Sequence, residues 1–227
     1  MSADSSGFFD SISSEYTAQI RRCVPRYDEM LWAVLDYVPS DLAPQRILEL
    51  GCGAGNLTVQ LAEKYPQAEL HLADFSAGMM AQCEARVGAQ ARIIPHIEDF
   101  RRLSFPSESI DLVASTISLH HLTDAEKKTL FRAIFSWLRP GGVFVFSDQF
   151  AGKTEETYAR HQHHWREAAM KLGATEQEWA AWMEHQAAHD YHSPLIDQMQ
   201  WLAEAGFVDI DCPWRYLLWT VLIARRP

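Results

Sequence analysis

The sequence has few of the features that mark secreted, membrane-bound or metal-stabilised proteins. Only four of its 227 residues are cysteines (Cys23, Cys52, Cys83 and Cys212), and their spacing matches no zinc or redox motif. No apolar run approaches the roughly 18–20 residues that a membrane-spanning helix needs. The polar start also lacks a basic-then-apolar signal segment. We therefore expect a cytoplasmic protein with reduced thiols and no membrane partner.

Basic residues are also scarce. The 20 Lys and Arg residues are outnumbered by 30 Asp and Glu, which gives a formal net charge of −10 at pH 7. Proteins that bind nucleic acid normally present a basic face, so we expect no nucleic-acid partner and a small-molecule substrate instead. A hydrophobic content of 48% in a chain of this length predicts a single domain, residues 1–227, with an ample core.

The most informative segment is residues 46–58. A short apolar run ends at Glu49 and is followed by three glycines at alternate positions, Gly51, Gly53 and Gly55, and then by an amphipathic stretch. This pattern predicts a buried strand that turns sharply into a helix. Asp74 closes a second apolar strand 19 residues after Gly55, where an acid meets ribose hydroxyls in nucleotide-binding α/β folds. Together the two features predict an adenosine site.

The glycine spacing argues against a dinucleotide. A dinucleotide fingerprint has its third glycine or alanine three residues after the second. Asn56 stands at that position here, so a dehydrogenase is disfavoured.

Further motifs follow in a fixed order. They are Asp74-Phe75-Ser76, the stretch from Asp99 to Pro106, the apolar strand 109–115, Leu119-His120-His121-Leu122, and the helix stop Trp137 to Gly142. Over nearly its whole length the chain resembles class I S-adenosylmethionine (SAM) methyltransferases, with motifs like those of ubiquinone and menaquinone methyltransferases. The resemblance implies SAM as cofactor, S-adenosylhomocysteine as product and methyl transfer as the activity.

The expected fold is α/β and Rossmann-like. Strands alternate with helical stretches from residue 46 to 150, as in a parallel sheet with helices on both faces. The last two strands, around 207–210 and 216–224 with a break at Pro213, are joined too tightly for a parallel crossover and must form a hairpin. The resemblance implies seven strands in the order 3-2-1-4-5-7-6, the last one antiparallel.

Two segments lie outside the SAM-binding core 46–150. Residues 8–45 are helical around Pro25, and residues 151–195 read as two helices broken near Gly173, with Thr175 and Glu178 forming a capping box. We expect both segments to form a lid over the carboxyl ends of the strands, where ligands bind in such sheets. Residues 196–227 would supply the last helix and the hairpin.

The resemblance assigns roles to individual residues. Asp74 would bind the ribose, Asp99 the adenine amine, and Glu49 either the methionine ammonium or the glycine loop itself. The full cofactor-binding set is Tyr16, Arg26, Glu49, Gly51, Cys52, Gly53, Gly55, Asp74, Phe75, Met79, Asp99, Phe100 and Ser115. The expected substrate-binding residues are Tyr27, His120, Tyr158 and Trp165.

The catalytic candidates are His120, His121 and Asp148, which follow strands four and five. An imidazole near its ordinary pKa can serve as a general base at neutral pH. The alternative, which we favour, is that residues 119–122 form a turn that packs against the next helix. Six more histidines lie in residues 151–195, and His185, His189 and His192 have a spacing that could ligate a metal. A solvated lid helix explains them as well, and we predict no metal site.

Two alternatives stay open. The stretch from Arg21 to Tyr27, the end of strand five and the His-rich insert are similar to carboxy-S-adenosylmethionine synthase. In that family an Arg in the insert holds the cofactor's extra carboxylate, whereas here Glu178 to Met183 contains no basic residue. A non-catalytic SAM-binding protein is the other alternative. The sequence does not identify the methyl acceptor, nor does it decide between a monomer and a homodimer.

Overall fold

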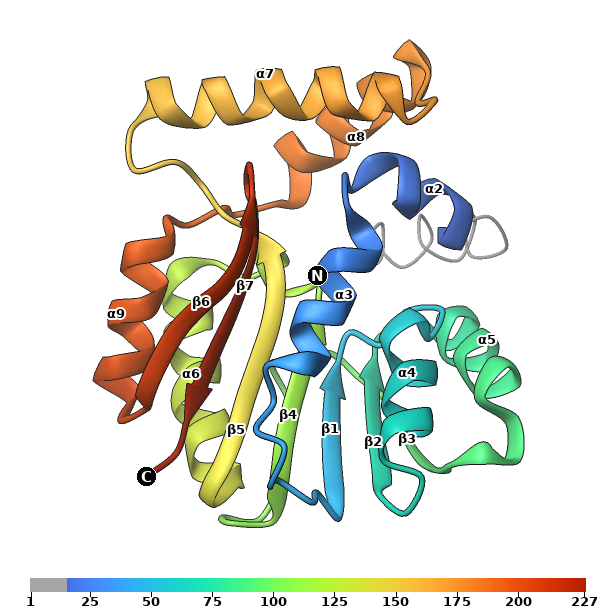
Figure 1. Cartoon of the computed structure of the whole chain (residues 1–227), viewed down its shortest axis with the longest axis vertical. Coiled ribbons are helices and arrows are strands. Elements are labelled where there is room, and N and C mark those ends of the chain that lie inside the picture. The colour runs from blue at the N-terminus through green and yellow to red at the C-terminus, as the bar shows by residue number, and fades with distance from the viewer. Residues whose placement is uncertain (1–15) are drawn as a thin grey trace.

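A seven-stranded sheet organises the molecule. The computed structural model describes residues 16–227. Within them the strand order is β3-β2-β1-β4-β5-β7-β6 (Figure 1). The strands are β1 (Arg46–Leu50), β2 (Glu69–Asp74), β3 (Arg92–Ile97), β4 (Ile110–Thr116), β5 (Leu138–Gln149), β6 (Val208–Tyr216) and β7 (Trp219–Arg225). The first five pair in parallel, and β7 runs antiparallel to both β5 and β6. The predicted order and the antiparallel last strand are confirmed.

Helices cover both faces of this sheet. Alternate residues of β1 enter two separate apolar clusters: Ile47 belongs to one, and Leu48 and Leu50 to the other. This two-sided burial is typical of parallel strands. Three helices, α3 (Tyr27–Asp36), α4 (Asn56–Lys64) and α5 (Ala77–Val87), pack on the Ile47 side. The helices α6 (Asp124–Trp137) and α9 (Leu195–Ala205) pack on the other side.

Two strands depart from the expected limits. Strand β5 begins at Leu138, inside the predicted helix stop 137–142, because a register shift opposite Ile110 and Leu112 accommodates the turn-forming residues 139–142 within the strand. Pro213 lies inside β6 and does not interrupt it. That strand is the sheet edge, where a missing N–H is tolerated, and its pairing with β7 is irregular between Val208 and Trp214.

Three helices form what we call the helical cap: α2 (Tyr16–Cys23), α7 (Glu155–Lys171) and α8 (Glu176–His189). They lie beyond the carboxyl ends of the parallel strands (Figure 1). The buried Trp165 of α7 donates from Nε1 to the Cys23 carbonyl of α2 at 2.6 Å, which joins segments 142 residues apart. The predicted capping box of Thr175 and Glu178 is present at the start of α8.

The segment that carries α7 and α8 begins and ends at one place. Ala151 forms a parallel bridge with Pro194, and the Ala151 N–H donates to the Ser193 carbonyl at 3.1 Å. Two short 3-10 helices, η1 (Gly88–Gln90) and η2 (Leu119–His121), complete the described part of the chain. None of the described helices is long and apolar enough to cross a membrane.

Candidate active site

The glycine-rich turn connects β1 to α4. Gly51, Gly53 and Gly55 have φ angles of 69°, 50° and 82°, a left-handed backbone that other residues adopt at a cost. The Gly51 N–H donates to the Ala73 carbonyl of β2 at 2.8 Å. This bond fixes the turn against the end of the neighbouring strand.

Asp74 holds the next part of the turn. Its Oδ2 accepts from the Gly53 N–H at 2.8 Å, and its Oδ1 accepts from the Ser76 N–H at 2.9 Å. Each carboxylate oxygen has two lone pairs, so Asp74 keeps acceptor capacity for a ligand hydroxyl. The structure therefore brings together Gly51, Gly53 and Asp74, as the sequence predicts.

A cleft opens above this turn. It encloses about 660 Å³, part of it continuous with solvent. Its walls combine glycine-loop backbone, apolar side chains and a few polar groups, at Tyr27, Gly51, Cys52, Gly53, Ala54, Asn56, Asp74, Phe75, Met79, Phe100, Thr116, Ile117, Ser118 and His121. Phe75, Met79 and Phe100, all expected to contact the cofactor, lie on its apolar side.

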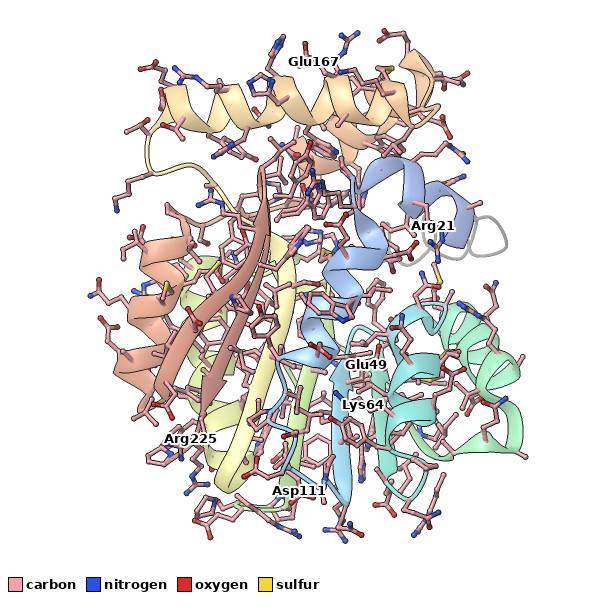
Figure 2. The ribbon with its side chains drawn as sticks, in the orientation of Figure 1. Arg21, Glu49, Lys64, Asp111, Glu167 and Arg225 are labelled. Atoms are coloured by element: carbon pink, nitrogen blue, oxygen red, sulfur yellow. The ribbon has the colours of Figure 1, made fainter. Side chains whose placement is uncertain are left out.

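Glu49 is not among the lining residues. It is buried between β1 and α4, where its Oε2 accepts from the Thr58 hydroxyl at 2.7 Å (Figure 2). Its Oε1 has no hydrogen-bond partner among the described residues. Burial, reinforced by Cys83, raises the pKa of the Glu49 carboxyl well above its ordinary value. This hydrogen bond ties β1 to the first turn of α4, on the two sides of the glycine loop, which is closer to the structural one of the two roles expected for Glu49.

Several expected cofactor contacts lie away from the cleft lining. Asp99 pairs with the Arg101 guanidinium at 2.6 Å. Ser115 donates from Oγ to the Leu50 carbonyl beneath the loop at 2.8 Å. Arg26 lies 4.3 Å above the Tyr216 ring of the terminal hairpin, with half of its side chain exposed. The side chain of Tyr16 lies outside the described residues.

Tyr27 lines the cleft from α3. Its hydroxyl accepts from Asn56 Nδ2 at 3.0 Å, which connects the helix to the start of α4. Burial raises the pKa of Tyr27 to about 12, so its hydroxyl stays protonated and can donate to a ligand at neutral pH.

Of the three catalytic candidates, only His121 lines the cleft. His120 lies behind it, and its Nδ1 is 2.5 Å from Asp148 Oδ1. The His120 backbone N–H donates to the other Asp148 oxygen at 2.8 Å. Burial lowers the pKa of His120, but the charges of Asp148 and Asp190 outweigh burial and raise it above its ordinary value. Burial and the neighbouring His120 lower the pKa of His121.

Asp190, which is not among the predicted site residues, is the centre of this region. His121 Nδ1 lies 3.1 Å from its Oδ1, and His120 Nε2 lies 3.7 Å from the same oxygen. His185 and His192 approach within 3.9 and 3.6 Å. The expectation of a solvated helix is therefore wrong for these two residues, whose side chains are 16% and 5% exposed. The run His-x-x-x-His-Asp-x-His at 185–192 was the signal in the sequence.

Two expected substrate contacts are also absent from the cleft lining. The Tyr158 hydroxyl bonds His192 Nδ1 on the cap side of Asp190. Trp165, on α7, is buried between the helical cap and the sheet, with its ring 5.7 Å from Trp219 of β7 and 4.7 Å from Trp179 of α8. Both residues stabilise the packing of α7 and α8 over the sheet.

Comparison with known proteins shows the family to which this chain belongs. A family model described as a methyltransferase domain matches residues 47–142. An uncharacterised methyltransferase of Geobacillus kaustophilus is 35% identical over 162 residues, which cover 68% of this chain and 71% of that protein. The chain belongs to the class I SAM-dependent methyltransferases. It is a SAM-dependent methyltransferase, and SAM is its methyl donor.

Solved structures agree at the level of the fold. A SAM-dependent methyltransferase from Mesorhizobium loti superposes with a TM-score of 0.62 at 22% identity, covering 87% of this chain and 98% of that one. Phosphoethanolamine N-methyltransferase 2 of Haemonchus contortus, solved with phosphomonomethylethanolamine and S-adenosylhomocysteine, gives 0.63 at 18% identity. The superposition covers 88% of this chain and 54% of the Haemonchus contortus chain.

The cleft residues fit SAM. A Cβ on Gly53 would meet no atom within 4 Å, so the loop leaves open space where the ligand would lie against the backbone. Asp74 offers acceptor oxygens for the ribose, and Phe75 and Phe100 offer apolar surface for a purine. Tyr27, with its protonated hydroxyl, provides a donor on the same wall.

Proposed function

We propose that this methyltransferase acts on a small-molecule acceptor that enters the cleft beside His121. The observation that carries the proposal is the cleft itself: it encloses about 660 Å³ beside the glycine loop, and α3 supplies Tyr27 to its wall. The helical cap lies beyond the same end of the sheet (Figure 1). A cleft of this size suits a small molecule better than a folded macromolecule. The net charge of −10 further disfavours a polyanionic acceptor.

The lining also narrows the chemical class of the acceptor. Among the described residues that line the cleft there is no lysine or arginine. Phosphate esters are normally held by such groups, so the phosphoethanolamine of the Haemonchus contortus enzyme would lack a charged partner here. We infer a flat acceptor that is neutral or weakly polar.

His121 is the residue we assign to contact the acceptor's nucleophile. Bound SAM supplies an electrophilic methyl group on a sulfonium. The chain's own residues position the acceptor in line with that methyl and exclude water, and this orientation is much of the catalysis. Asp148 positions His120, which in turn packs against His121 with ring centroids 4.0 Å apart.

The test uses SAM labelled in its methyl group, incubated with the protein and a cell extract divided into low-mass and macromolecular fractions. We expect label to enter the low-mass fraction and the Asp74→Ala variant to transfer far less. Transfer confined to RNA or protein in the macromolecular fraction would refute the small-molecule assignment. Mass spectrometry of the nucleoside released on denaturation would identify SAM or S-adenosylhomocysteine independently of the acceptor. Wild type serves as the matched control.

A further inference from the structure

The cluster around Asp190 has the composition of a transition-metal site. Four imidazole nitrogens lie within 3.1–3.9 Å of its two carboxylate oxygens, contributed by His120, His121, His185 and His192. They come from η2, from α8 and from the linker to α9. The Asp190 side chain is only 4% exposed. A carboxylate buried this deeply needs positive charge or hydrogen bonds beside it, and a divalent cation ligated by the imidazoles would supply that charge.

Two of these histidines have one ring nitrogen already held. His120 Nδ1 contacts Asp148 at 2.5 Å, and His192 Nδ1 contacts the Tyr158 hydroxyl. In both rings the remaining nitrogen, Nε2, is directed toward Asp190. A carboxylate or hydroxyl that fixes the second nitrogen of a ligating histidine is the usual outer shell of a protein metal centre.

Unpartnered atoms point to the same place. Asp190 Oδ1 and His192 Nε2 are both buried and form no well-aligned hydrogen bond among the described residues, although His121 Nδ1 lies 3.1 Å from the carboxylate oxygen. Buried polar groups are nearly always satisfied by protein, water or an ion. A cation bound to Asp190 Oδ1 would satisfy that oxygen and would lie beside His192.

We propose that His120, His121 and Asp190 bind a divalent first-row transition ion, with His185 and His192 beside it. One ligand atom from each of the three residues lies within 4.8 Å of the other two. Ligands bound at about 2.0–2.2 Å in a tetrahedron lie roughly 3.3 Å apart. Asp190 Oδ1 lies 3.1 Å from His121 Nδ1 and 3.7 Å from His120 Nε2, one on each side of that separation. The mixed imidazole and carboxylate set favours Zn²⁺, Co²⁺ or Fe²⁺, whereas Mg²⁺ and Ca²⁺ take oxygen ligands.

The position of the ion gives it a role that rests on the proposed function. His121 lines the cleft, so a metal held by it would lie at the wall where the acceptor binds. An acceptor oxygen could then complete the coordination, and a metal-bound hydroxyl loses its proton more readily. The binding of the ion itself can be measured without any acceptor.

The experiment is a Co²⁺ titration of the full chain after treatment with a chelator. Wild type should bind one equivalent and develop d–d absorption in the visible range, which Zn²⁺ should abolish by competition. Asp190→Asn should weaken Co²⁺ binding by at least an order of magnitude. Asp148→Asn, which changes only the group that orients His120, should weaken it by about 10–100-fold.

The matched control is a second group of histidines in the same chain. His163, His164 and Glu167 also have ligand atoms within reach of one another, but all three are exposed on the outer face of α7, where Glu167 points away from the sheet (Figure 2). The double variant His163→Ala/His164→Ala should bind Co²⁺ like wild type. If it loses the spectrum while Asp190→Asn keeps it, the proposed site is wrong.

Other outcomes are equally decisive. A wild-type chain that shows no stoichiometric Co²⁺ spectrum overturns the proposal, whatever the variants do. Circular dichroism and a SAM titration of each variant separate lost metal binding from lost folding. If Asp190→Asn does not fold, the Co²⁺ spectrum of the wild type and the Co²⁺ affinity of Asp148→Asn test the proposed metal site. SAM binding and methyl transfer that persist without any metal binding would refute this inference and leave the proposed function standing.

Discussion

Gly51 and Ser118 lie so close that no side chain fits between them: a Cβ on Gly51 would be 2.4 Å from the Ser118 Cβ and 2.5 Å from its Oγ. Gly53, two residues along the same loop, has nothing within 4 Å of the corresponding position. Both residues have positive φ angles, so the two glycines share the backbone requirement and differ only in space.

This contrast predicts that alanine substitution will destabilise the protein less at Gly53 than at Gly51. Gly53→Ala should lower the free energy of unfolding by about 1–2 kcal/mol, the cost of a left-handed conformation. Gly51→Ala adds a clash and should lower it by about 2–5 kcal/mol in total. Gly53→Ala should nevertheless weaken SAM binding, because its methyl group would project into the open space of the cleft. Urea denaturation and SAM titration measure both effects. Equal losses of stability would contradict the assignment of the clash to Ser118.

Replacing Asp74 should weaken SAM binding. The Asp74→Ala variant loses the acceptors of the Gly53 and Ser76 N–H groups as well as those for the ribose. We expect SAM binding to weaken by about 1–3 kcal/mol in isothermal titration calorimetry. Asp209→Ala is the matched control, since that acid pairs with Arg225 on the terminal hairpin. Unchanged affinity in Asp74→Ala would remove Asp74 from the cofactor site.

Glu49 should make stability depend on pH in an unusual direction. Its folded pKa is raised above the ordinary value of 4.5, so the folded state binds the proton more tightly than the unfolded state. The contribution of Glu49 to the free energy of unfolding is therefore fully present below pH 4.5 and is lost as the pH rises toward the folded pKa. Glu49→Gln keeps an acceptor for the Thr58 hydroxyl and removes the titration.

The corresponding measurement is urea unfolding of both proteins across a pH series. The stability of Glu49→Gln relative to wild type should increase as the pH rises above 4.5. Parallel curves for the two proteins would show that Glu49 keeps its ordinary pKa in the folded state.

The helical cap should open when Trp165 loses its N–H. Trp165→Phe keeps an aromatic ring against Trp219 and leaves the Cys23 carbonyl without its partner at 2.6 Å. An unsatisfied buried acceptor costs about 1–3 kcal/mol. Hydrogen exchange should accelerate in α2 and α7 while β4 keeps its protection. Trp32→Phe, at a site 52% exposed, is the control. Uniform acceleration across the sheet would instead indicate global destabilisation.

Local patterns account for what the sequence predicts well. The glycine turn, Asp74 and the capping box at Thr175 follow from short segments whose residue types and spacing have a direct backbone consequence. The alternation of strands and helices and the terminal hairpin could be predicted for the same reason, whereas the strand order is implied by the resemblance to class I methyltransferases.

The histidine cluster could not be predicted in this way. His120 and Asp190 are 70 residues apart, and only the packing of the α8–α9 linker on η2 brings them together. Two residues that were expected to bind the cofactor pair with other side chains instead of lining the cleft. Asp99, expected at the adenine, is engaged by Arg101, and Arg26, expected at the cofactor, stacks on Tyr216. Such pairings depend on neighbours that no motif specifies.

The bridge between Ala151 and Pro194 has a consequence for how such a protein can diversify. Because the segment between them leaves and rejoins the framework at a single point, its length and sequence can change without altering any sheet pairing. Loop-closure entropy grows only slowly with length, so insertions there are tolerated. Asp190 and His192 lie within this exchangeable cassette, whereas His120, His121 and Asp148 belong to the framework. Replacement of one contiguous stretch of the gene would thus exchange His185, Asp190 and His192 and leave His120, His121 and the glycine loop unchanged.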